Sequence, residues 1–170
     1  MSNIFIPARE SEDWKQLLAD PEKQWKKGYS ARALAHCWQS ADGLPDEVRT
    51  VLTGSGIPTL ESPELLIALP EHRVPLPGGA APSQTDLWCL TRAGSELISI
   101  AVEGKVAEPF GPALGDWLQD ASSGKQERLR YLAQKLGLSL PLPDAIRYQL
   151  IHRTASAVIE AECFNAAGAM

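Results

Sequence analysis

The feature that most constrains the fold is a predicted β-hairpin whose turn contains Gly94 and Ser95. Residues 86–91 and 96–106 have the composition of two strands, and only a short turn separates them. Glycine at the first central position is typical of a type II′ turn, which joins two antiparallel strands through two residues. The sequence therefore predicts an antiparallel pair of strands with a defined register.

This register decides which residues of the two strands face each other. If Ala93 pairs with Glu96, Asp86 lies directly opposite Glu103. Two carboxylates in opposed positions, with β-carbons about 5 Å apart, repel each other and destabilise a hairpin. A cation between them, or full exposure to water, would remove this cost. Because carboxylate oxygens suit hard divalent cations, the sequence predicts a site for magnesium or manganese here.

Side chains alternate between the two faces of a strand, which divides the second strand into two groups. One group is apolar and is predicted to face the core: Ile98, Ile100 and Val102. The other group consists of Ser99, Ala101, Glu103 and Lys105. Lys105 is therefore expected beside Glu103, with Asp86 across from them, and we interpret these three residues as the catalytic cluster.

The rest of the chain predicts one domain of mixed α/β structure. A length of 170 residues suits a single domain with a substantial core. Residues 1–60 have the pattern of a helical N-terminal region, in which Ser11 and Ser30 are predicted helix caps. Residues 62–163 contain the strands and then further helices. This order predicts a mixed sheet flanked by helices.

Composition and charge limit the classes of function. The net charge of −5 argues against a protein that coats nucleic acid by electrostatic attraction alone, but not against an enzyme with a local basic patch. No apolar run reaches the roughly 18 residues of a membrane span, and the N-terminus lacks a secretory signal. A cytoplasmic protein without a membrane partner is expected. Cys37, Cys89 and Cys163 are scattered among apolar residues and are predicted to be buried, reduced thiols.

Asp86 followed by Glu103-Gly104-Lys105 at the end of the next strand resembles the motif of the PD-(D/E)XK nuclease superfamily. The surrounding sequence, from Glu71-His72 through Pro77-Gly78-Gly79 to Ser83-Gln84-Thr85-Asp86, resembles bacterial members of that group. Their core is described as a helix, a strand meander, a helix and further strands. The resemblance thus implies a restriction-endonuclease-like mixed sheet core over residues 62–163. Residues 166–170 look like an apolar element cut short, so the C-terminal strand is expected to be truncated or missing.

The resemblance also implies roles for the motif residues. Asp86 and Glu103 would bind magnesium together with the carbonyl oxygen of Gly104. Lys105 would orient the attacking water and stabilise charge on the phosphate, in keeping with general metal-ion and electrostatic catalysis. Thr85, and not proline, precedes Asp86.

Four further residues are candidates, each with a structural alternative. Glu71 could add a third carboxylate to the metal site, or be an exposed loop residue. Gln84 could hydrogen-bond the metal site, or cap the entrance of the strand. Gln149 and Arg153 lie one turn apart on a long helix predicted from Asp144, its cap, to about residue 163. They could contact substrate phosphates, or lie on a solvated polar face opposite a core stripe that includes Leu150.

Three functions follow from these residues. The first is a magnesium-dependent phosphodiesterase that acts on DNA, or with less support on RNA. The second is a non-catalytic member of the same fold that binds nucleic acid or a protein partner. The third treats the cluster as an ordinary surface salt-bridge network on an unrelated domain. The oligomeric state stays open, with a homodimer as one arrangement.

Overall fold

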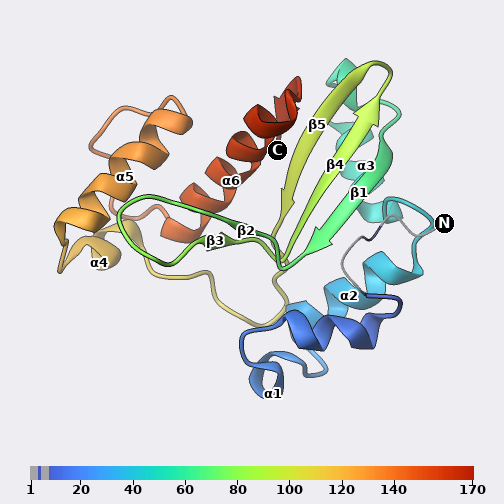
Figure 1. Ribbon diagram of the computed structural model, residues 1–170, viewed down its shortest axis with the longest axis horizontal. Coiled ribbons are helices and arrows are strands. Elements are labelled where there is room, and N and C mark those ends of the chain that lie inside the picture. The colour runs from blue at the N-terminus through green and yellow to red at the C-terminus, as the bar shows by residue number, and fades with distance from the viewer. Residues whose placement is uncertain (1–3, 5–7) are drawn as a thin grey trace.

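The computed structural model describes residue 4 and residues 8–170, which form a mixed α/β fold around a four-stranded sheet (Figure 1). The strands are β1 (Glu64–Pro70), β4 (Leu87–Ala93), β5 (Glu96–Val102) and β6 (Gly168–Ala169). They lie in the order β1-β4-β5-β6, with β6 parallel to β5 and the other neighbours antiparallel. A separate two-stranded ribbon, β2 (Arg73–Val74) and β3 (Ser83–Gln84), connects β1 to β4.

The hairpin of β4 and β5 has the predicted register. Ala93 pairs with Glu96 at the turn, and Leu87 pairs with Val102 at the far end. Gly94 has a φ of +61°, which a type II′ turn requires at this position. Because Asp86 and Glu103 are the residues just beyond the last pair, they face each other at the open end of the hairpin.

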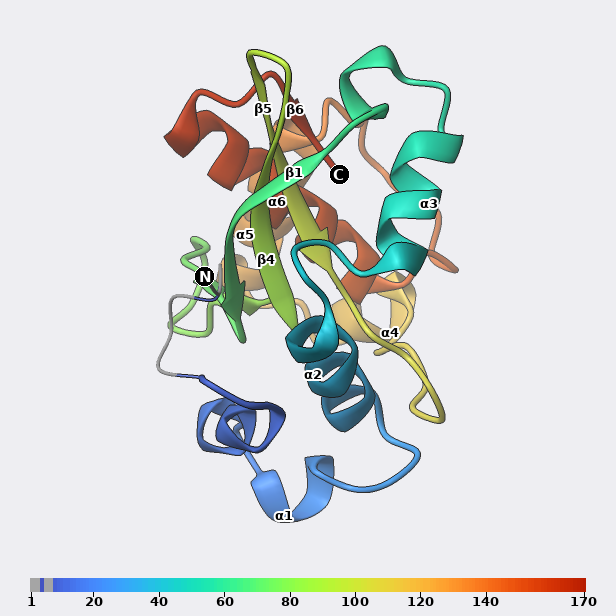
Figure 2. The same cartoon turned by 90° about the vertical axis from the view of Figure 1, so that its right-hand side faces the viewer.

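Both faces of the sheet are covered by helices, which lie on opposite sides of the strands (Figures 1 and 2). The N-terminal helices cover the face that carries Leu87, Cys89, Ile98 and Ile100, and Val102 is partly buried against the same cluster. The helix α6 (Tyr148–Phe164) covers the other face. There Ser99 donates a hydrogen bond to the carbonyl oxygen of Ala157 at 2.8 Å and accepts one from the indole of Trp88 at 2.9 Å. Alternation along β5 thus separates its residues as predicted.

The N-terminal region is helical, as predicted, but the predicted caps are wrong. Its elements are the 3-10 helix η1 (Ser11–Leu17), α1 (Pro21–Gln24), α2 (Ser30–Ser40), α3 (Asp46–Gly54) and the 3-10 helix η2 (Pro58–Leu60). The N-cap positions are Glu10 for η1 and Tyr29 for α2, so Ser11 and Ser30 cap neither helix. Ser30 instead donates its N–H and its hydroxyl to Glu108, at 2.7 and 2.8 Å.

The C-terminal helices form a second apolar cluster on the α6 side of the sheet. They are α4 (Leu114–Leu118), α5 (Ser123–Lys135) and α6. Leu114, Leu132 and Ile151 are buried where these helices meet. The helix α6 begins at Tyr148, after the N-cap residue Arg147. The prediction of a helix that starts at Asp144 is therefore wrong by one turn.

A short strand, β6, lies where the C-terminal strand was expected to be truncated or missing. Asn165 ends α6 in the left-handed conformation, with a φ of +50°, which is a common way to end a helix. The chain then returns along β5, where Ala167 donates to Leu97 at 2.8 Å and Met170 donates to Ser99 at 2.9 Å. The short strand β6 is thus the fourth strand of the described sheet.

The structure also tests the expectations for the cysteines and for a membrane span. The three cysteines are free, but only Cys89 is fully buried; Cys37 is partly buried and Cys163 is exposed, so the prediction of buried thiols is wrong for Cys163. Within the described ranges, none of the helices combines the length and apolar character needed to cross a membrane.

Candidate active site

Four segments meet at the open end of the β4-β5 hairpin and bring the predicted site residues together. Glu71, which directly follows β1, lies beside Asp86, which directly precedes β4, and the N–H of Glu71 donates to the carbonyl oxygen of Asp86 at 3.0 Å. The remaining residues come from β3, from the end of β5 and from the first turns of α6, namely Gln84, Glu103, Gly104, Lys105, Gln149 and Arg153. Hydrogen bonds, described below, link all of them into two adjoining groups.

Glu103 is the centre of the first group. Its Oε1 accepts hydrogen bonds from the ammonium of Lys105 at 2.7 Å and from the amide of Gln149 at 2.6 Å, and its Oε2 accepts one from Nε of Arg153 at 2.7 Å. The side chain of Glu103 is only 12% exposed. Two cations and an amide therefore satisfy a carboxylate that would otherwise be costly to bury.

Asp86 faces Glu103, and no cationic side chain among the described residues hydrogen-bonds to it. Its Oδ2 accepts the backbone N–H of Gly104 at 2.8 Å. Burial raises the pKa of Asp86 to about 6, and the negative charge of Glu103 adds to this effect. A β-carbon at position 104 would lie 3.3 Å from the β-carbon of Ser30 and 3.5 Å from Oδ2 of Asp86. The contact with Asp86 would be an ordinary one, whereas the contact with Ser30 would be tight, so glycine at position 104 lets the chain pass close to α2.

Glu71 is the third carboxylate of the cluster, and it is partly buried rather than an exposed loop residue. Its Oε2 accepts a hydrogen bond from the amide of Gln84 at 2.6 Å, and Oε1 of Gln84 accepts one from Arg73 at 3.1 Å. Burial raises the pKa of Glu71 to about 7, and the charges of Asp86 and Glu103 act in the same direction.

The backbone of Glu71 is in the left-handed region, with a φ of +53°. A residue other than glycine in this region costs of order 1 kcal/mol or more and persists where the surrounding structure requires it. Glu71 therefore holds both a strained backbone and a buried acid at the same position. Such positions concentrate at functional sites.

Gln149 and Arg153 point from α6 into the cluster, so they do not lie on a solvated face of the helix. Oε1 of Gln149 accepts the N–H of Gly111 at 3.2 Å, and Arg153 donates to the hydroxyl of Ser83 at 3.3 Å. Leu150, which was predicted to face the core, is 46% exposed. Ala157 and Ala161, further along α6, are buried, so the prediction of a core face fails in the first turn of the helix and not along its whole length.

Sequence reasoning did not pair the residues whose contacts support this face of α6. Nδ1 of His152 lies 2.8 Å from the hydroxyl of Ser83. Burial, with the positive charges of Arg153 and Arg128, lowers the pKa of His152 to about 3, so its ring is neutral. Two turns further along α6, Oε1 of Glu160 lies 2.9 Å from Nε2 of His72. These contacts join residues far apart in the chain, and no local pattern could have indicated them.

The donor set suits a hard divalent cation, but its arrangement is not that of a preformed metal site. Glu71, Asp86, Glu103 and the carbonyl of Gly104 offer oxygen ligands, which magnesium and manganese prefer. In the part of the chain that the structure describes, however, no three histidine, cysteine or acidic side chains are placed to hold a metal ion. Since Glu103 is engaged by three donors, a cation would have to compete with Lys105 and Arg153 for it.

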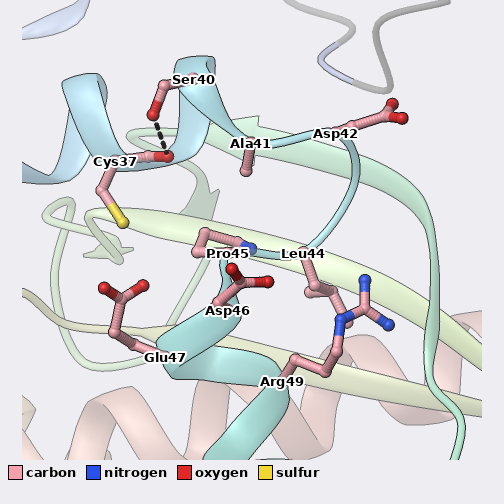
Figure 3. Close-up of a pocket in the computed structure, with 9 residues that line it drawn as sticks. All are labelled: Cys37, Ser40, Ala41, Asp42, Leu44, Pro45, Asp46, Glu47 and Arg49. Atoms are coloured by element: carbon pink, nitrogen blue, oxygen red, sulfur yellow. Dashed lines mark hydrogen bonds between the residues drawn. The ribbon is translucent and has the colours of Figure 1, made fainter.

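A pocket of about 500 Å³ lies elsewhere, between α2 and α3, and contains none of the residues of this cluster (Figure 3). Asp46 and Glu47 on its wall are in the first turn of α3, where acidic side chains stabilise the helix dipole. The guanidinium of Arg49 donates to the carbonyl of Pro63 at 3.3 Å. Burial raises the pKa of the Cys37 thiol, with a smaller effect from Glu47. These residues have structural roles, and the pocket lacks an activated nucleophile.

The chain belongs to the family described as a domain of unknown function, DUF6946, whose family model matches residues 7–170. No curated protein and no solved structure matches the chain.

Proposed function

We propose that this DUF6946 domain hydrolyses phosphodiester bonds of DNA in a magnesium-dependent reaction, with a site of the PD-(D/E)XK type. One observation carries the proposal. Asp86 and Glu103 face each other at the end of paired strands, and Lys105 contacts Glu103 at 2.7 Å. Acid, acid and lysine in this arrangement are what the motif requires.

The order of the elements supports a restriction-endonuclease-like core. A helix precedes an antiparallel meander of β1, β4 and β5, and α6 and the strand β6 follow it. The cluster lies where the meander opens and where α6 begins. This is the order of elements that the resemblance implies, with the final strand included.

The raised pKa values supply the second line of support. Asp86 and Glu71 have pKa values of about 6 and 7 because burial and neighbouring carboxylates disfavour their charged forms. A divalent cation would offset this repulsion, and perturbed acids of this kind concentrate at functional sites. The proposal explains why the fold retains two acids that are costly to ionise.

In this proposal each residue of the cluster has a distinct role in metal binding or catalysis. Asp86, Glu71, Glu103 and the carbonyl of Gly104 would hold the metal ion, which, when bound, acidifies water and offsets the charge that develops on the phosphate. Lys105 places an ammonium next to the reacting groups and stabilises negative charge there. Arg153 and Gln149 fix the orientation of Glu103 from α6, and Gln84 fixes that of Glu71.

The carboxylate of Glu103 already accepts three hydrogen bonds within the protein. This favours a second candidate, a non-catalytic domain of the same fold that binds nucleic acid or a protein. In this alternative Lys105 and Arg153 serve as permanent counterions of a buried glutamate. The net charge of −5 also favours it. The two candidates differ in whether the cluster accepts a metal ion and cleaves DNA.

A cleavage assay separates them. Purified protein is incubated with plasmid, linear duplex and single-stranded DNA in Mg²⁺, in Mn²⁺ and in EDTA. We expect cleavage that requires the metal ion and that falls by roughly 10²-fold or more in Lys105→Ala, the usual effect of removing one group that stabilises transition-state charge.

The matched control is Lys135→Ala, which removes a lysine paired with Glu162 on α5 and α6, outside the cluster. It should cleave as the wild type does. Absence of cleavage with every substrate and metal ion, or equal loss in both variants, would contradict the proposal.

A further inference from the structure

The segment from Val106 to Pro112 forms a rim beside Lys105, between β5 and α4. In Figure 1 it is the yellow segment that passes close to α2 before it reaches α4. Glu108 attaches its first half to α2, since the carboxylate accepts the N–H and hydroxyl of Ser30 at 2.7 and 2.8 Å. The N–H groups of Val106 and Ala107 also donate to Glu108, both at 3.1 Å.

The second half of the same segment is attached to α6. The N–H of Gly111 donates to Gln149 at 3.2 Å, and its carbonyl accepts from Arg147 at 3.2 Å. Pro109 and Pro112 restrict the backbone on either side, because proline fixes φ. The segment is therefore held at both ends by side chains of two different helices, although it has no regular secondary structure.

Between these attachment points the segment presents an aromatic ring to solvent. Phe110 is 43% exposed, although large apolar side chains are more often buried. Nζ of Lys105 lies 5.8 Å from the centroid of its ring. Such a distance allows a cation–π contact. An exposed ring, on a segment that is attached at both ends, thus lies next to the lysine of the proposed active site.

We propose that Phe110 stacks against an unpaired nucleobase of a DNA strand whose phosphate is bound near Lys105. The inference rests on the proposed function and specifies the substrate as single-stranded or locally unpaired DNA. Every base has a flat face that stacks on aromatic rings, whatever its sequence. In a duplex both faces of an interior base are covered by its neighbours, so only an unpaired base reaches Phe110.

The charges around the ring fit this occupant. Lys105 lies on one side of Phe110, and Arg147, which is exposed, contacts the adjacent Gly111. Cationic side chains close to a stacking platform suit the phosphates of a bound strand. Glu108, the acid within the segment, has its oxygens occupied by the four donors named above.

Binding of a single-stranded oligonucleotide that contains 2-aminopurine tests the proposal. Affinity and the quenching of 2-aminopurine fluorescence are measured in EDTA and in Ca²⁺, and cleavage rates on single-stranded and duplex DNA are measured in Mg²⁺. Phe110→Ala should weaken single-strand binding roughly tenfold, as loss of one base stack does, and abolish the quenching. Phe110→Trp should retain both, and Val106→Ala, at an exposed position of the same segment, should change neither.

The outcomes distinguish this inference from the proposed function. If the wild type cleaves DNA in Mg²⁺ but Phe110→Ala binds and cleaves single strands as the wild type does, the stacking inference is wrong and the nuclease proposal stands. An equal loss on duplex and single-stranded DNA would also overturn the stacking inference. If the wild type neither binds nor cleaves any DNA, both proposals fail.

Discussion

Replacing Glu71 by glutamine should stabilise the metal-free protein at pH 8, although it removes a residue of the proposed site. In the folded protein the pKa of Glu71 is raised from 4.5 to about 7, mainly by burial. A carboxyl with a raised pKa binds its proton more tightly in the folded state than in the unfolded state. The stability of the wild type therefore falls as the pH rises from about 4.5 to about 7, and the loss is complete above this range.

The size of the effect follows from the pKa values. A pKa difference of one unit between the folded and unfolded states corresponds to about 1.4 kcal/mol. The difference between 4.5 and about 7 therefore amounts to about 3 kcal/mol at pH 8. Glutamine has no charge to lose and can still accept the hydrogen bond from Gln84. For a chain of this length the gain corresponds to a rise in Tm of about 6 to 12 °C.

Urea unfolding of the wild type and Glu71→Gln at pH 4.5 and pH 8, in EDTA, measures this difference. The matched control is Glu127→Gln on the exposed surface of α5, for which we expect less than about 0.5 kcal/mol at either pH. A glutamine variant that is no more stable than the wild type at pH 8, or whose gain is the same at pH 4.5, would refute the reasoning.

Two other predictions concern the same cluster. Saturating Mg²⁺ at pH 8 should raise the Tm of the wild type, by an amount equivalent to about 2.7 kcal/mol at a hundred times the Kd, and should leave the Tm of Asp86→Ala unchanged. Differential scanning fluorimetry measures both, and no shift in the wild type would argue for the non-catalytic alternative. Glu103→Gln should destabilise the metal-free protein by about 3 kcal/mol, because it leaves two cations without their buried partner. The control Glu64→Gln, which breaks the exposed pair with Arg92, should cost less than about 1 kcal/mol. Equal losses of stability in urea unfolding of the two variants would contradict the central role of Glu103.

The hairpin and its cluster could be predicted because their geometry is local. A two-residue turn sets the register, and the alternation of side chains then places Glu103 and Lys105 on one face. The spacing of Gln149 and Arg153 on a helix likewise put both on one side of α6. These predictions required no knowledge of distant segments.

The predictions that failed depended on contacts between distant parts of the chain. Ser30 looked like a helix cap, but Glu108, 78 positions away, takes its donors. Leu150 looked like a core residue, but the polar side of α6 turns inward toward the sheet. The strand β6 has only two residues, which is too short for any alternation to appear.

The parallel pairing of β6 with β5 has a consequence for the order in which the protein assembles. The hairpin of β4 and β5 joins neighbouring residues, and its loop closes on the microsecond scale. The pairing of Ile98 with Gly168 instead requires the intervening chain, including α4, α5 and α6, to be folded back across the sheet. Such non-local pairings form slowly because the entropy of the connecting chain must be lost first. We therefore expect the edge of β5 to stay open until α6 has docked, and the acids at the end of the hairpin to meet each other before Arg153 and Gln149 arrive.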